Sequence, residues 1–93
     1  MIDKKWYIYM LLCNDNTTYF GITTDLKRRE KEHNGLDIKL GSKAKSRGAK
    51  YTRARRPVEI VYSEVSENRQ TASIREAELK KLKRVARLKL IVV

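Results

Sequence analysis

Residues 5–13 constrain the fold of this chain more than any other segment. They read Lys-Trp-Tyr-Ile-Tyr-Met-Leu-Leu-Cys, and aromatic and apolar side chains of this kind favour a β-strand. Strand side chains alternate, so the two faces would hold Trp6, Ile8, Met10 and Leu12 on one side and Tyr7, Tyr9, Leu11 and Cys13 on the other. Both faces are largely apolar, which predicts a strand in the centre of a sheet that is covered on both sides.

Two further strands are predicted. Residues 14–17, Asn-Asp-Asn-Thr, are turn formers, and residues 18–22 return to strand-forming side chains, so that a β-hairpin is expected. A third strand is expected over residues 58–62, where Pro57 stands at the start, a position at which proline is tolerated. These segments predict a small antiparallel sheet.

Helix signals occur on either side of the third strand. Residues 23–25, Thr-Thr-Asp, supply N-cap side chains for a helix that runs to about His33, and residues 34–35, Asn-Gly, would end it. Residues 69–83 contain strong helix formers, and residues 85–93 predict a short helix or a strand. The order of elements predicts an α+β fold, a three-stranded antiparallel sheet flanked by helices, in a single domain over residues 1–93.

The first of these helices is unusually polar. Leu26, Arg29, Glu30 and His33 would share one face at i, i+3, i+4 and i+7 spacing, and only Leu26 is apolar. A short helix with a basic residue and a histidine in place of its apolar stripe is locally inconsistent, and such positions tend to be functional. Arg29 shares this face with His33, whereas Arg28 points elsewhere.

The charge balance indicates an anionic partner. Lys and Arg number 22 against 11 Asp and Glu, a formal net charge of +11, which attracts polyanions. Nucleic acid is the first candidate and an anionic membrane surface the second, while a basic surface kept only for solubility is the alternative. The predicted nucleic-acid contacts are Lys43, Lys45, Arg47, Lys50, Arg53, Arg55 and Arg56, with Tyr51 placed to stack on a base.

The cysteine content and the size of the chain indicate its cellular compartment and the kind of substrate site that it can form. Cys13 is the single cysteine, so it can form neither an internal disulfide nor a cysteine-based zinc site, which fits a reducing compartment. The apolar run that ends there is too short to cross a membrane. We expect a cytoplasmic monomer. Because 93 residues leave no room for a large pocket between domains, its substrate should be met on a surface or in a shallow cleft.

Four separated stretches form a recognisable pattern over about residues 6–83. They are Tyr7-Ile8-Tyr9, Tyr19-Phe20-Gly21, residues 23–29 followed by His33, and Glu76 within the later helix. Their order and spacing resemble the GIY-YIG nuclease family, which includes the N-terminal incision domain of bacterial nucleotide-excision repair and the catalytic domain of some homing endonucleases. Residues 48–58 are similar to its small stand-alone bacterial subgroup. Tyr7 replaces the glycine that names the first motif, and Phe20 replaces the usual aliphatic residue of the second.

The resemblance implies a metal-dependent endonuclease that hydrolyses DNA phosphodiester bonds by a one-metal mechanism. Tyr9 would activate the attacking water, Tyr19 would orient the water or the scissile phosphate, and Arg29 would hold that phosphate. Glu76 would be the single protein ligand of a divalent ion, Mg²⁺ in the first place with Mn²⁺ as the alternative. His33 matches a histidine found in part of the family. DNA would be bound weakly and largely without sequence preference.

Other interpretations stay open on the residues alone. A phenol has a pKa of about 10, so as a base it needs positive charge nearby, which Arg29 and a bound metal ion could supply. Without the resemblance, the two tyrosines read as packing residues, Glu76 as a surface residue paired with Lys80, and His33 as a surface residue. The alternative function is a non-cleaving nucleic-acid-binding module of the same fold. A membrane-surface role is disfavoured, because no segment predicts an apolar helix face opposite a basic one.

Overall fold

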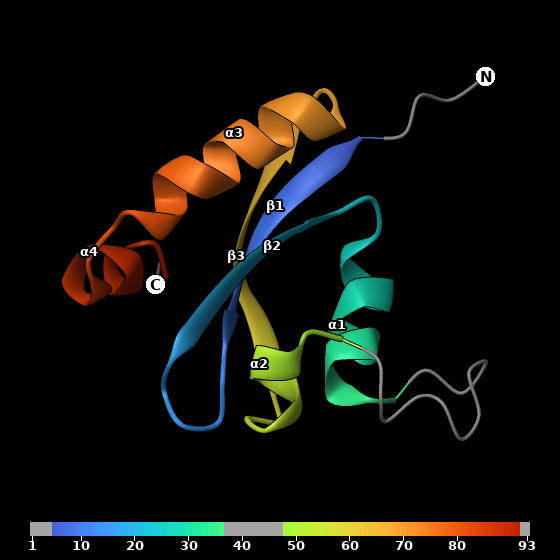
Figure 1. Cartoon of the computed structure of the whole chain (residues 1–93), viewed down its shortest axis with the longest axis vertical. Helices are drawn as coiled ribbons and strands as arrows, with labels where there is room; N and C mark the ends of the chain where they lie inside the picture. Colours follow the sequence, from blue (N-terminus) through green and yellow to red (C-terminus); the bar gives the residue numbers. More distant parts are fainter. Residues whose placement is uncertain (1–4, 37–47, 92–93) are drawn as a thin grey trace.

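The computed structural model describes residues 5–36 and 48–91, which form a sheet with helices on both faces (Figure 1). The strands are β1 (Trp6–Leu12), β2 (Thr18–Thr23) and β3 (Glu59–Ser66). All pairs are antiparallel and the order is β2-β1-β3, so β1 is the central strand, as its two apolar faces predict. The predicted fold class is confirmed, although β3 continues to Ser66, beyond the predicted end at residue 62.

Four helices complete the described chain. They are α1 (Leu26–Asn34), α2 (Lys50–Arg53), α3 (Arg69–Lys80) and α4 (Arg84–Lys89). The Asp25 carboxylate accepts a hydrogen bond from the Arg28 backbone N–H at 3.0 Å, and Gly35 ends α1 with a φ of 69°, so both predicted caps of α1 are confirmed. The prediction that α3 extends to residue 83 was wrong, since it ends at Lys80. The tail forms α4 rather than a strand, and none of the described helices is long and apolar enough to cross a bilayer.

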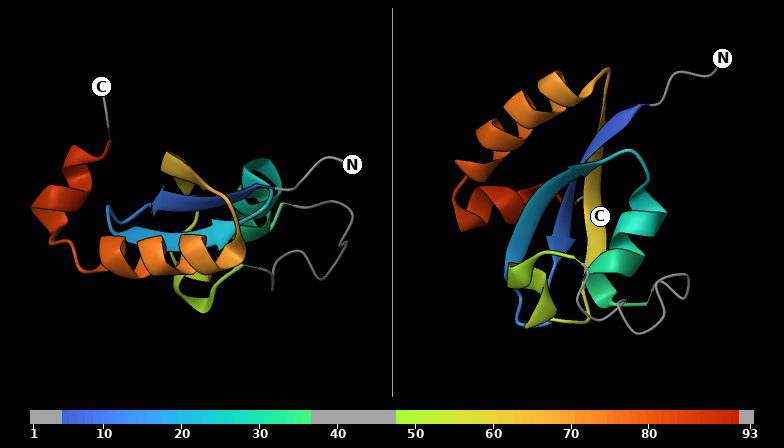
Figure 2. Two further views of the ribbon diagram at one scale, coloured as in Figure 1. Left: turned by 90° about the horizontal axis from the view of Figure 1, so that it is seen from above. Right: turned by 45° about the vertical axis from the view of Figure 1, so that its right-hand side comes forward.

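One face of the sheet is closed by α3. Ile8, Met10 and Phe20 from the hairpin pack there against Ala72 and Leu79 of the helix. All of these side chains are at most 2% exposed. Figure 2 shows α3 running alongside the sheet, with α4 beyond one end of it.

The opposite face carries more polar side chains and lies under α1 and α2. Its buried cluster consists of Tyr9, Leu11, Cys13 and Val58, with Tyr19, Leu26, Tyr51 and Ile60 packed around it. This division of β1 is the one predicted from alternation. The residues proposed from the tyrosine motifs therefore stand on the α1 face of the sheet.

Helix α1 is held over this face by side chains that form hydrogen bonds with backbone groups at the start of β3. The Asn34 side chain donates to the Val58 carbonyl at 2.8 Å and accepts from the Val58 N–H at 2.7 Å. The Glu30 carboxylate accepts from the Ile60 N–H at 2.8 Å. Because β3 is an edge strand, these bonds satisfy backbone groups that would otherwise stay unpaired. They also fix the position of the α1 residues that face the sheet.

Candidate active site

Tyr9 reaches its position because residue 21 has no side chain. Tyr9 on β1 and Gly21 on β2 are direct partners in the antiparallel register. A Cβ atom at residue 21 would lie 2.3 Å from the Tyr9 phenol oxygen, which is far too close for any other residue to fit without displacing the ring. The glycine of the second motif thus lets the ring lie across β2, with its hydroxyl directed toward that edge of the sheet.

Two side chains of α1 meet at the Tyr9 hydroxyl. Arg29 Nε donates to the phenol oxygen at 3.3 Å, and His33 Nε2 lies 2.7 Å from it. Both come from one face of α1, as their spacing predicts, while Arg28 is exposed. Arg29 Nη1 also donates to the Glu32 carboxylate at 3.0 Å, so the guanidinium bridges the phenol and an acid.

His33 is fully buried, so the interpretation of this residue as a surface histidine is wrong. Its Nδ1 lies 2.8 Å from Thr52 Oγ1, and the Thr52 hydroxyl donates to the Ala49 carbonyl at 2.9 Å. Since a hydroxyl has one proton, Thr52 then accepts a hydrogen bond from His33 Nδ1–H. The Ala49 N–H would favour the opposite tautomer, but at 3.4 Å from Nδ1 it makes the longest of these contacts. His33 Nε2 is therefore unprotonated and accepts from the Tyr9 hydroxyl.

Burial governs both titratable groups at this hydroxyl. It raises the pKa of Tyr9 to about 12, although the hydrogen bond and the charge of Arg29 act in the opposite direction. Burial likewise lowers the pKa of His33 to about 4, assisted by the positive charges of Arg29 and Arg56. Both groups are neutral at neutral pH. Arg29 does favour the tyrosine anion, as expected, but the cost of desolvating that anion outweighs the attraction.

Tyr19 borders the same cluster from β2. Its ring centroid lies 5.5 Å from that of His33, at an interplanar angle of 64°. On α2, Tyr51 stacks on Tyr19 with the centroids 5.7 Å apart, and the Arg55 guanidinium carbon lies 3.8 Å from the Tyr51 centroid. Tyr51 is therefore already engaged by two side chains of this chain. The prediction that it offers a free face to a base does not fit this arrangement.

Glu76 faces the sheet from α3. It shares the inner face of the helix with Ala72 and Leu79, both buried, and its own side chain is 21% exposed. A carboxylate on the face where a helix buries its apolar residues is a local exception to the pattern. The neighbouring acid, Glu78, is 59% exposed and pairs with Arg75 on the outer face. Helical phase thus separates the two acids, as predicted.

The Glu76 carboxylate has two electrostatic neighbours. Lys80 Nζ lies 3.6 Å from it, the ion pair that i, i+4 spacing predicts. Its negative charge also contributes to the raised pKa of Tyr9, although α3 covers the opposite face of the sheet. Across residues 5–36 and 48–91, no hydrogen bond joins Glu76 to Tyr9 or Arg29.

A protein-only metal cage is absent from the part of the chain that the structure describes, where no three His, Cys, Asp or Glu side chains are grouped to hold an ion. Mg²⁺ does not need such a cage, because it keeps several waters and is held by one or two carboxylates together with substrate phosphates. The half-buried carboxylate of Glu76 fits a site of that kind.

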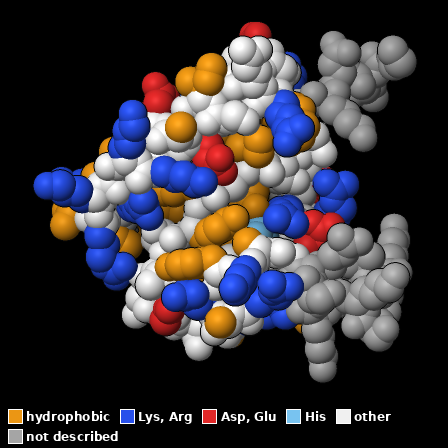
Figure 3. All heavy atoms as spheres, viewed as in Figure 1, with side chains coloured by type: hydrophobic (Ala, Val, Ile, Leu, Met, Phe, Trp, Pro, Cys, Tyr) orange, Lys and Arg blue, Asp and Glu red, His pale blue; other side chains and the backbone are white. Residues whose placement is uncertain are grey.

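The predicted nucleic-acid contacts fall into three groups. Lys43, Lys45 and Arg47 lie outside the described residues. Lys50 and Arg53 are exposed on α2. Arg55 is half-buried in an ion pair with Asp15 at 3.0 Å, and Arg56 Nε donates to a backbone carbonyl of α1 at 2.6 Å, so both also tie the chain together. Figure 3 shows Lys and Arg side chains spread over this side of the molecule, with few acidic ones.

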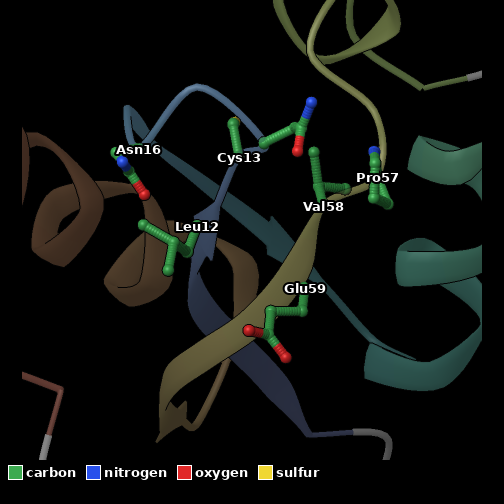
Figure 4. Close-up of a pocket in the computed structure, with 7 residues that line it drawn as sticks. Leu12, Cys13, Asn16, Pro57, Val58 and Glu59 are labelled. Carbon is green, nitrogen blue, oxygen red and sulfur yellow. The ribbon is translucent and has the colours of Figure 1, made fainter.

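A pocket of about 380 Å³ lies apart from this cluster, where β1 ends and β3 begins (Figure 4). It is lined by Leu12, Cys13, Asn14, Asn16, Pro57, Val58 and Glu59. The Cys13 thiol is buried, and burial raises its pKa, which disfavours the reactive thiolate. None of the residues predicted from the tyrosine motifs lines this pocket.

Comparison with known proteins decides the family. The sequence-family model described as the GIY-YIG catalytic domain matches residues 5–89 of this chain. The chain belongs to the GIY-YIG family. UPF0213 protein SAG0778 of Streptococcus agalactiae is 44% identical over 88 residues, which are 95% of this chain and 89% of the relative. UPF0213 protein DP2720 of Desulfotalea psychrophila is 44% identical over 77 residues, or 83% of this chain, and there the match spans only 62% of the relative.

A solved structure supports the GIY-YIG assignment. The solution NMR structure of UPF0213 protein BH0048 from Bacillus halodurans is 36% identical, with a TM-score of 0.52, over 94% of this chain and 82% of the other. The predicted resemblance is thereby confirmed. GIY-YIG domains form a nuclease family whose members generally use a divalent metal, while the names of these relatives state no activity.

Two polar side chains at the candidate active site were not predicted. Glu32 lies three residues after Arg29, at a spacing that places both on one helix face, so the pattern could have indicated this pair. Thr52 contacts His33 across 19 residues of sequence. That contact depends on where α2 packs, and no local spacing predicts it.

Proposed function

We propose that this chain is a single-domain, metal-dependent DNA endonuclease whose active centre surrounds the Tyr9 hydroxyl. The observation that supports this most is the convergence of Arg29 and His33 on that hydroxyl, at 3.3 and 2.7 Å, in a chain of a nuclease family. The hydroxyl thus has one cationic donor and one neutral acceptor. This is a set of groups suited to moving a proton next to an anion.

Tyr9 and His33 would together take the proton of the attacking water. With a pKa of about 12, Tyr9 is protonated and cannot act as a base alone. We infer that it passes its proton to His33 Nε2 while it takes one from water, so that no free tyrosine anion is required. The pKa of His33, about 4, is held down partly by the charge of Arg29. A substrate phosphate beside Arg29 would offset that charge and make His33 a better acceptor.

Arg29 and Tyr19 would hold the scissile phosphate. The Arg29 side chain is 29% exposed, so an incoming phosphate can reach it, and the Glu32 carboxylate keeps the guanidinium oriented at 3.0 Å. A fixed guanidinium stabilises the negative charge that develops on phosphate oxygens during hydrolysis. Tyr19, half-buried against the His33 ring, would donate its hydroxyl to the same phosphate.

Glu76 would hold the divalent ion, Mg²⁺ or Mn²⁺, with waters and phosphate oxygens as the other ligands. When bound, such an ion supplies positive charge to the phosphate and to the leaving oxygen. Lys80 Nζ lies 3.6 Å from the Glu76 carboxylate and would have to move away from it when an ion binds.

Cleavage assays with a matched pair of variants test this function. Plasmid, single-stranded and branched DNA are incubated with the protein, with and without Mg²⁺ or Mn²⁺. We expect ion-dependent nicking that is lost in Glu76→Gln and kept in Glu78→Gln, since the second acid faces outward on the same helix. If the protein binds these DNAs but cuts none of them with either ion, it is a nucleic-acid-binding module with a nuclease fold instead.

A further inference from the structure

A second pocket lies beside the candidate active site, between the β1–β2 turn, α2 and the C-terminal helix. It measures about 320 Å³ and is lined by Thr17, Thr18, Tyr51, Leu82, Arg84 and Arg87. In Figure 1 the hairpin turn lies between α4 and α2. The pocket adjoins the active centre through Tyr51, which stacks on Tyr19. Apart from Tyr51, its residues belong neither to the tyrosine motifs nor to the predicted DNA contacts.

Within the part of the chain that the structure describes, the two guanidinium groups of this pocket donate their hydrogen bonds to neutral oxygens. Arg84 Nη1 donates to the Asn16 carbonyl at 2.8 Å. Arg87 donates to Thr18 Oγ1 at 3.2 Å and to two backbone carbonyls near the end of α3 at 2.9 and 2.6 Å. Neither forms an ion pair with a carboxylate of the described chain, in contrast to Arg29 and Arg55. No carboxylate among the described residues therefore compensates these two positive charges.

The two arginines are suited to different tasks. Arg87 uses all of its nitrogens in the bonds to Thr18 and α3, and its guanidinium lies 5.2 Å from the Phe20 ring, so it is a fixed charge. Arg84 is exposed and, toward the described residues, donates through Nη1 alone, so that Nε and Nη2 have no acceptor among them. Thr18 accepts from Arg87 and keeps its own hydroxyl proton for an acceptor in the pocket.

We propose that this pocket binds a phosphate of the DNA strand a few nucleotides from the cleaved bond. Two guanidinium groups without a described carboxylate partner and the Thr18 hydroxyl favour an anion, while Leu82 offers an apolar wall for the attached sugar. The ring contacts from Tyr51 to Tyr19 and from Tyr19 to His33 span 5.7 and 5.5 Å. In a DNA duplex each strand advances about 3.4 Å per nucleotide along the helix axis. The pocket and the candidate active site are therefore close enough to contact one DNA strand a few nucleotides apart. This inference rests on DNA being the substrate in the proposed function.

The test compares two variants of α4 that lose the same charge. Arg84→Gln removes the proposed contact, while Lys89→Gln removes an exposed charge that lies on roughly the opposite side of the helix from Arg87. Binding of a fluorescent single-stranded oligonucleotide is measured without divalent metal at several salt concentrations. We expect Arg84→Gln to weaken binding about 10-fold and to reduce the slope of log K against log salt by about one. Lys89→Gln should change the affinity less than about 2-fold.

Equal effects of the two substitutions would show that Arg84 contributes only to the general positive field, and would overturn the subsite. Arg84→Lys serves as the second variant, because it keeps the charge and should keep the salt slope while losing the geometry of the guanidinium. Thermal unfolding checks that each variant is folded. Since the assay measures binding without cleavage, a protein that cuts no DNA would end the proposed function and leave this result standing.

Discussion

The Tyr9 hydroxyl has two neighbours with opposite tendencies at the scale of single residues. Arg29 donates to its oxygen and His33 accepts its proton, so the hydroxyl is oriented from both sides. Burial keeps the tyrosine neutral against the attraction of the guanidinium for its anion, whereas burial and the positive charges of Arg29 and Arg56 act together to keep the histidine neutral. The chemistry of this site therefore depends on a hydrogen-bond chain and on how tightly the chain is packed, which makes Gly21 and His33 the positions to change.

Gly21→Ala should displace the Tyr9 ring, because the new Cβ would lie 2.3 Å from the phenol oxygen. We expect a loss of about 1–3 kcal/mol in the free energy of unfolding, measured with denaturant. A Tyr9→Ala background lacks the ring atoms that clash, so Gly21→Ala should lower the free energy of unfolding less in that background. Equal costs in the two backgrounds would show that the glycine serves another purpose.

Protonation of His33 should destabilise the fold in acid. With a pKa of about 4 in the folded chain and about 6.5 when unfolded, the unfolded state binds more protons between these values. The stability that neutral His33 contributes is thus complete above about pH 6.5 and is lost as the pH falls toward 4. The free energy of unfolding of the wild type should fall more steeply over this window than that of His33→Gln. Parallel curves would contradict the lowered pKa.

At the scale of elements, local signals predicted what depends on local physics. The alternation in β1 and the caps of α1 were sufficient for a central strand and a helix with Arg29 and His33 on one face. The extension of β3 was missed because residues 63–66 include polar side chains such as Ser63 and Glu64, which do not favour a strand by composition. These residues form a strand because they pair with the start of β1. The burial of His33 was missed because α2 covers it from a distant part of the sequence.

Thr52 links α2 to α1 through His33, which can be tested by removing one hydroxyl. Thr52→Val keeps the shape but leaves His33 Nδ1–H buried without its acceptor at 2.8 Å. We expect a loss of about 1–3 kcal/mol in unfolding free energy, together with slower DNA cleavage, because the other tautomer no longer accepts from Tyr9. Thr52→Ser keeps the hydroxyl and should restore both. A serine variant as impaired as the valine variant would argue against the hydrogen bond.

At the scale of the whole molecule, the proposed active centre draws side chains from helices on both faces of one sheet. Helix α1 brings Arg29 and His33 to one face, while α3 brings Glu76 to the other. The whole chain carries a formal net charge of +11. Affinity for DNA should then come mainly from phosphate contacts on exposed basic residues such as Lys50 and Arg84.

DNA binding should accordingly depend steeply on salt. Three or more phosphate contacts give a slope of about −3 or steeper for log K against log salt on duplex DNA. Fluorescence anisotropy with duplexes of unrelated sequence measures both this slope and any sequence preference. A shallow slope, or an affinity that differs strongly between sequences, would mean that base contacts rather than charge dominate.

The cooperation of Tyr9 and Glu76 across the sheet is tested most directly by single-turnover cleavage of DNA in Tyr9→Phe, Glu76→Gln and the double variant, with Mg²⁺ present and with thermal unfolding as a check on folding. We predict that each single substitution slows cleavage at least about 10²-fold, and that the double variant is no slower than the worse single one, because both groups serve one chemical step. Single variants that cut like the wild type, or losses that multiply in the double variant, would contradict a shared active centre.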